Sequence, residues 1–249
     1  TDASAPAHGV DGAWVSDATY KVDTEAGANN TTVTKVLARR MNVYGGMRMG
    51  GSSYYGLDVL NPKQPKLLFR IEPSTNGFGR LGQSWSKPVM ANIRYNGAIT
   101  RVMIVGGGYD SCYEDPDFSL ASTGNGTTCA TTSQAKGNAV YIVNAQTGAL
   151  IWSATYAASA TDGRQYMKHS IVSRISTLDR DADGLTDHLY FGDLGGQIFR
   201  ADLNNKQTLT DATYSSFGVR VVRLANLATD DTTYDPDNRY TGGKAPRFY

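Results

Sequence analysis

The sequence is poor in cysteine and histidine and has no long hydrophobic run. Its 249 residues include 2 cysteines and 3 histidines. No apolar run approaches the roughly 20 residues that a membrane-spanning helix needs, so we expect no membrane span. His8, His169 and His188 have no cysteine or serine motif around them. They therefore do not indicate a catalytic site, and we expect the chain not to be an enzyme.

An excess of charge of either sign is also missing. The chain has 24 Lys and Arg residues against 23 Asp and Glu residues, a net charge of +1. Without a dense basic patch, nucleic acid is not an expected partner. The first 30 residues lack the layout of a signal peptide, and position 1 is Thr rather than Met. These features predict a fragment of a larger protein, with any export signal upstream.

The two cysteines lie in one segment rich in Ser, Thr and Gly. Cys112 and Cys129 fall within residues 109–137, which we interpret as a loop insertion. A disulfide between them would close a short loop, worth about 3 kcal/mol in the chain-entropy model, and would indicate an oxidising compartment. Two free thiols are the alternative.

Helical periodicity is hard to find, whereas short β-branched and aromatic runs recur between glycine, asparagine and aspartate. The 27 glycines and 15 tyrosines fit this pattern, which predicts an all-β fold. Residues 55–59, 141–145 and 199–203 share an aromatic residue, Asp or Asn three positions later, and then an apolar residue. Each follows a glycine-rich segment. The chain therefore contains a weak internal repeat.

A second correspondence links two longer stretches. Aligning residues 101–107 with residues 187–193 places residues 179–187 where the first copy has the turn Tyr95-Asn96-Gly97. Asn-Gly is a strong signal for a β-hairpin. Repeated four-stranded units of this kind indicate propeller blades. We predict one β-propeller domain over residues 1–249, an incomplete ring of about four blades.

The stretch DRDADGLTD, residues 179–187, has the spacing of a calcium loop. Asp179, Asp181, Asp183 and Asp187 occupy its positions 1, 3, 5 and 9, and the Leu185 carbonyl is available at position 7. Gly184 at position 6 permits a sharp reversal. Oxygen ligands without His or Cys favour Ca²⁺ over zinc or copper. We predict that these five residues bind Ca²⁺.

The loop differs from an EF-hand, because position 12 is Tyr190 and the flanking segments are expected to be strands. Spacing leaves two other interpretations open. One is a solvated Asp-rich turn without metal, and the other is a calcium site with a purely structural role.

Four stretches resemble the C-terminal domain of the PilY family, large proteins at the tip of bacterial type IV pili. The resemblance covers residues 42–203 and keeps the order of the segments, namely GGMRMGGSSYYGLDVLNPKQPKLLFRI (45–71), LGQSWSKPVMANI (81–93), VYIVNAQTGALI (140–151) and the calcium-loop unit through HLYFGDLGGQIFRADL (188–203).

The resemblance implies a modified, quinoprotein-like β-propeller in a secreted or surface-exposed, pilus-associated protein. Its calcium loop would influence pilus extension and retraction. Pilin and minor pilins at the pilus tip are the implied partners, and adhesion and twitching motility are the implied processes. Contact with a host or abiotic surface would belong to a separate N-terminal region. The location would be the pilus tip or the outer membrane.

Two alternative functions remain. Residues 140–152 also look like a blade of the quinoprotein dehydrogenases, which bind calcium beside pyrroloquinoline quinone, but their adjacent cysteine pair is missing here. A lectin-like propeller would use tryptophans as a sugar platform. We instead expect Trp14, Trp85 and Trp152 to pack within or between blades.

Overall fold

Three four-stranded antiparallel sheets make up the fold of residues 9–114, 136–205 and 220–227, which the computed structural model describes. The first sheet contains β1 (Trp14–Ala26), β2 (Thr32–Gly46), β3 (Tyr54–Asp58) and β4 (Lys66–Ile71). The second contains β5 (Val89–Tyr95), β6 (Ala98–Gly106), β7 (Ala139–Asn144) and β8 (Leu150–Thr155). The third contains β9 (Ser176–Leu178), β10 (His188–Gly192), β11 (Gln197–Asp202) and β12 (Arg220–Asn226).

Within each sheet the strands are neighbours in chain order, as in a propeller blade. The short turns η1 (Ala28–Asn30), η2 (Arg48–Gly50), η3 (Ser111–Glu114) and η4 (Gly163–Tyr166) are 3-10 helical. None of the helical turns in the described ranges is long and apolar enough to cross a bilayer. The predicted all-β, propeller-type fold is therefore confirmed, and these residues form three blades rather than about four.

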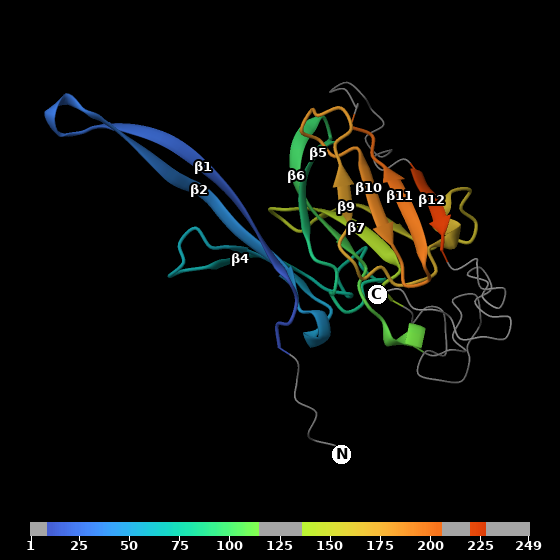
Figure 1. Cartoon of the computed structure of the whole chain (residues 1–249). Helices are drawn as coiled ribbons and strands as arrows, with labels where there is room; N and C mark the ends of the chain where they lie inside the picture. Colours follow the sequence, from blue (N-terminus) through green and yellow to red (C-terminus); the bar gives the residue numbers. More distant parts are fainter. Residues whose placement is uncertain (1–8, 115–135, 206–219, 228–249) are drawn as a thin grey trace, which may run out of the picture.

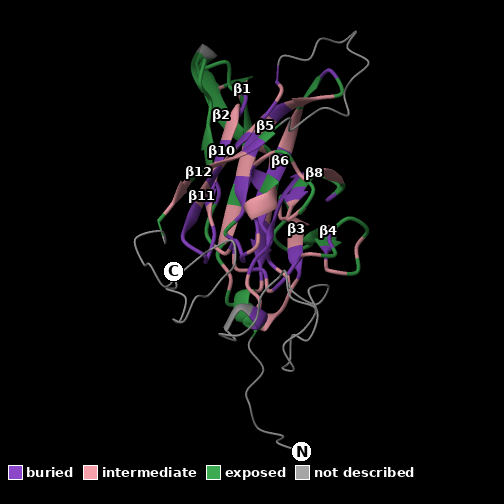
Figure 2. Ribbon diagram, turned by 90° about the vertical axis from the view of Figure 1, so that its right-hand side faces the viewer, coloured by how far each residue is buried: buried purple, intermediate pink, exposed green. Residues whose placement is uncertain are grey.

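The second sheet lies between the other two. Successive side chains of a strand point to opposite faces, and along β6 Val102 and Ile104 enter one apolar cluster while Met103 and Val105 enter the other. The first cluster also contains residues of the third sheet, such as Phe199, and the second contains residues of the first sheet. Figure 2 shows the buried residues concentrated in this central part of the molecule.

The repeat found in the sequence falls on equivalent strands. Its three copies lie on β3, β7 and β11, the third strand of each sheet. Asn96 and Gly97 both have positive φ, 49° and 75°, as the turn between β5 and β6 requires. Residues 179–187 connect β9 to β10, the equivalent pair in the third sheet. The alignment of this loop with the Asn-Gly turn is confirmed.

The hairpin of β1 and β2 projects well away from the three-sheet body (Figure 1). Only residues Asn42 to Gly46 of β2 pair with β3, so the rest of the hairpin has no third strand beside it. Its base is held by the buried Asp17 carboxylate, which binds Arg40 at 2.9 Å and Arg101 of β6 at 2.7 Å. The hairpin is thus anchored at one end and exposed along most of its length.

The tryptophans lie half-buried against other groups. Trp14 covers Gly45, Trp152 packs against the cluster between the second and third sheets, and Trp85 lies between Tyr109 and the Arg48 guanidinium, each 4.7 Å away. This agrees with packing roles for all three. Of the predicted insertion, Cys112 is buried in η3, whereas Cys129 lies outside the described residues, so the disulfide remains a prediction.

Candidate metal centre

The Asp-rich loop follows β9 and leads directly into β10. Two residues inside it adopt left-handed backbone conformations, Ala182 with φ of 60° and Gly184 with φ of 85°. Gly184 adopts this conformation without steric cost. The two residues reverse the chain within a few positions, which allows side chains from both arms of the loop to meet.

Three carboxylates come together at this reversal. Asp179, Asp181 and Asp187 each offer an oxygen, and these oxygens all lie within 4.8 Å of one another. Asp179 and Asp181 are exposed, and Asp187 is half-buried. Two like charges 4 Å apart repel by about 1 kcal/mol in water and by more where solvent is partly excluded. A hard cation would turn this repulsion into attraction, so the donor set fits Ca²⁺.

Asp183 and Leu185, the other two predicted ligands, do not belong to this three-carboxylate cluster. Asp183 Oδ1 accepts a hydrogen bond of 2.8 Å from the Leu185 backbone N–H, and the Leu185 side chain is buried. A carboxylate has about four acceptor sites, so this hydrogen bond leaves Asp183 able to bind a cation as well.

Backbone amides hold two of the clustered carboxylates in place. The Gly184 N–H donates to Asp179 Oδ2 and the Arg180 N–H donates to Asp187 Oδ2, both at 2.8 Å. Hydrogen bonds to an ionised acceptor are among the stronger ones in proteins. They draw the first and last aspartates of the loop toward its centre, so the chain itself supplies part of the geometry that an ion would need.

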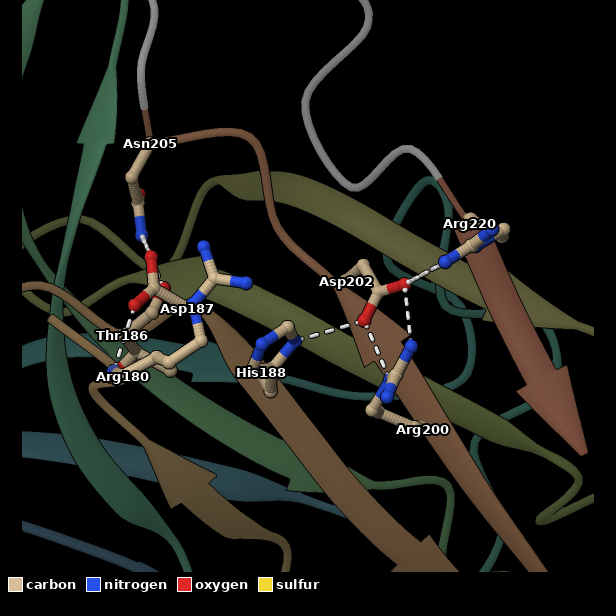
Figure 3. A network of polar contacts seen from close by, with 8 residues as sticks. All are labelled: Arg180, Thr186, Asp187, His188, Arg200, Asp202, Asn205 and Arg220. Atoms are coloured by element: carbon tan, nitrogen blue, oxygen red, sulfur yellow. Dashed lines mark hydrogen bonds and ion pairs between the residues drawn. The ribbon is translucent and has the colours of Figure 1, made fainter. Parts of the chain in front are cut away.

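Asn205, beyond β11, connects the loop to the second sheet. Its side chain is buried, and Nδ2 donates to the Thr186 carbonyl and, at 3.4 Å, to Asp187 Oδ1. Its Oδ1 accepts from the Arg94 backbone N–H at 3.0 Å, and its carbonyl accepts from Arg94 Nε at 3.1 Å. Figure 3 shows the Asn205 amide pointing at Asp187.

A backbone contact strengthens the same junction, because the Thr186 N–H donates to the Asn92 carbonyl of β5 at 2.9 Å. The sequence did not reveal this role for Asn205. In the sequence Asn204-Asn205-Lys206 resembles any polar turn, and no local signal distinguishes Asn205 from Asn204.

His188, next to Asp187, belongs to a separate charge network on β10 and β11. Its Nδ1 lies 2.8 Å from Asp202 Oδ1, and Asp202 also pairs with Arg200 at 2.7 Å and Arg220 at 2.9 Å. Burial raises the pKa of Asp202, but hydrogen bonds from its arginine and histidine partners outweigh burial and leave that pKa below its ordinary value. His188 is therefore a strand residue paired with a carboxylate.

Comparison with known proteins gives matches to one family by sequence. No protein-family model matches the chain. The type IV pilus biogenesis factor PilY1 of Pseudomonas aeruginosa strain PAO1 is 30% identical over 164 residues, 64% of this chain. PilY1 of strain UCBPP-PA14 is 28% identical over 162 residues. The predicted resemblance to the PilY family is confirmed. The chain spans about 11% of the length of these PilY1 relatives.

Solved structures add weaker similarities. The C-terminal domain of Pseudomonas aeruginosa PilY1 aligns with a TM-score of 0.49 and 22% identity, over 80% of this chain and 35% of that domain. BamB from Moraxella catarrhalis aligns with a TM-score of 0.35 and 12% identity, over 74% of this chain and 46% of BamB. The relationship to PilY therefore rests on sequence, and it makes this chain a relative of pilus-associated proteins.

Proposed function

We propose that this chain is a calcium-binding, propeller-type domain of a type IV pilus-associated protein. The observation that carries the proposal is the cluster of Asp179, Asp181 and Asp187, whose oxygens lie within 4.8 Å of one another. Asp183 and the Leu185 carbonyl complete the proposed ligand set. The similarity to PilY1, named a pilus biogenesis factor, supports the pilus association.

Calcium would act on the junction between the second and third sheets. Without a cation, the clustered carboxylates repel one another, and the loop relies on its amide hydrogen bonds. With Ca²⁺ bound, Asp187 would be drawn toward the ion, and Asp187 already contacts Asn205, which hydrogen-bonds to Arg94 of β5. Loading the loop would thus stiffen the contact between two blades.

The link between the calcium loop and the junction of the second and third sheets suits a regulatory role. A stiffer blade junction would change the surface offered to pilin and minor pilins at the pilus tip, and so influence pilus extension and retraction, adhesion and twitching motility. The proposed location is the cell surface, at the pilus tip or the outer membrane. A separate region of the longer protein would contact a host or abiotic surface.

The domain would bind Ca²⁺ and respond to it by changing its contacts with partners, and it would not catalyse a reaction. A quinone-dependent dehydrogenase places calcium beside its cofactor, whereas the proposed ligands here all come from one nine-residue loop. No observation on the described part of the chain favours the enzyme interpretation. An absorption band of bound quinone in the purified protein would revive it.

Isothermal titration with Ca²⁺ tests the binding proposal on the whole 249-residue chain. Extracellular Ca²⁺ sites commonly have Kd values of about 10⁻⁴ to 10⁻³ M. We expect a single site whose Kd lies in that range or is lower, which means tighter binding. Asp181→Ala should abolish the heat of binding. Asp23→Ala, which removes an aspartate from the projecting hairpin, is the matched control and should bind as wild type does. Equal binding by wild type and Asp181→Ala would contradict the assignment.

A further inference from the structure

The projecting hairpin has two chemically different faces. We call residues 20–26 and 32–38 the arm. Residues paired across antiparallel strands share a face, and every second residue along a strand returns to it. One face therefore carries only uncharged side chains, in the pairs Tyr20–Ala38, Val22–Val36, Thr24–Thr34 and Ala26–Thr32.

The opposite face carries all the charge of the arm. It is formed by the pairs Lys21–Leu37, Asp23–Lys35 and Glu25–Val33. Its charges are matched on that same face, because Lys21 binds Asp23 at 3.4 Å and Lys35 binds Glu25. This charged face is well suited to water, and the uncharged face is not.

The uncharged face is nevertheless open to solvent. Tyr20, Val22 and Val36 keep 60%, 63% and 65% of their surface exposed. A two-stranded hairpin alone is marginally stable in water, and contiguous exposed apolar surface commonly marks a contact site. The arm therefore has the chemistry of one half of a sheet-to-sheet contact.

We propose that the uncharged face of the arm binds the same face of a second copy of this chain. The face carries no charge, so any charged partner surface would lose hydration without gaining an ion pair. The same face of an identical arm is likewise uncharged and two strands wide, so it matches this face in both respects. Two-fold contacts of one surface with itself are the commonest way in which identical chains associate.

The area of the face fits a weak dimer. A specific interface needs about 1,000 Å² in total, or about 500 Å² from each partner. The eight side chains of the face reach that figure if they lose about 60 Å² each on average. The large, well-exposed Tyr20, Val22 and Val36 would contribute more than that average, and the small, half-buried Ala38 less. Contacts of this size are typical of reversible, concentration-dependent association.

Sedimentation velocity of the 249-residue chain tests the proposal. We expect a monomer–dimer equilibrium between about 1 µM and about 500 µM, the range that brackets a weak dimer. Val22→Lys places a lysine of each copy in the contact, and we expect it to weaken the dimer at least tenfold. Val36→Lys, the cross-strand neighbour, should do the same.

Val33→Lys is the matched control, since it introduces the same side chain on the charged face, opposite Glu25. It should leave the equilibrium unchanged, and all three variants should melt as wild type does because their sites lie far from the core. A wild-type chain that stays monomeric throughout, or equal weakening by Val33→Lys and Val22→Lys, would overturn the proposal. Dimer formation should persist in Asp181→Ala, which separates this proposal from calcium binding.

Discussion

Asn205 donates a hydrogen bond to Asp187 from 18 residues further along the chain, so a buried amide beyond β11 helps to position a candidate calcium ligand. Because its carbonyl and amide oxygens also accept from Arg94, the same residue bridges two sheets.

Asn205→Ala should both destabilise the fold and weaken Ca²⁺ binding. Removing one partner of a buried hydrogen bond costs about 1–3 kcal/mol, and several bonds converge here. We expect a lower free energy of unfolding by urea denaturation and a several-fold higher Kd by calorimetry. Asn204→Ala, at the neighbouring half-buried position, is the control and should change both little. A Kd unchanged in Asn205→Ala would show that the bridge does not position the site.

Saturating Ca²⁺ should raise the thermal stability of the domain. A ligand at 100 times its Kd stabilises the native state by about 2.7 kcal/mol. We expect Tm to rise with Ca²⁺ concentration and not to rise in Asp183→Ala, because Asp183 is a proposed ligand. If Asp183→Ala responds as wild type does, only the three clustered aspartates bind the ion. Equimolar Mg²⁺, which demands a tighter octahedral site, should stabilise the domain less.

Asp193 should make the free energy of unfolding fall as pH rises from about 4 toward neutrality. Burial raises the pKa of Asp193 to about 7, against hydrogen bonds from Gln197 and Gly195 and the charge of Arg223, which lower it. The unfolded carboxyl ionises near pH 4 while the folded one keeps its proton, so the free energy of unfolding falls by about 1.4 kcal/mol per pH unit between these values.

Asp193→Asn tests this sign. Urea unfolding from pH 4 to pH 8 gives the free energy of unfolding of wild type and of Asp193→Asn. The value for wild type minus the value for Asp193→Asn should be largest at pH 4 and should fall as the pH rises. This difference should stop changing with pH above the pKa that Asp193 has in the folded state. A difference that is flat with pH, or that grows toward pH 8, would show that Asp193 is ionised in the fold.

Asp17→Ala should loosen the base of the projecting hairpin. Asp17 is buried and pairs with both Arg40 and Arg101, so its loss leaves two partly buried guanidinium groups without their shared carboxylate. Removing one partner of a fully buried pair costs about 3–5 kcal/mol, and the arginines are about one third exposed, so we expect roughly half of that. Asp23→Ala removes an exposed pair and should cost under about 1 kcal/mol.

Much of the site and of the fold was predictable because it depends on local rules. The positions of Asp179, Asp181 and Asp187 within nine residues bring their oxygens together once Gly184 reverses the chain. Asn96-Gly97 forms its turn because both residues tolerate the positive φ that the turn requires. Gly108 has φ of 90° and lies so near the Gln83 carbonyl that a Cβ would be 1.9 Å from its oxygen.

The sequence by itself determined the strands, the turns and the spacing of the candidate ligands, since these follow from the period of side chains along the backbone and from which residues tolerate positive φ. Only the tertiary structure decided that Asn205 reaches Asp187, that Asp17 meets Arg101 from 84 residues away, and that the uncharged face of the arm stays open. Such contacts depend on how separate sheets pack, and no pattern within one strand encodes its neighbour in another sheet.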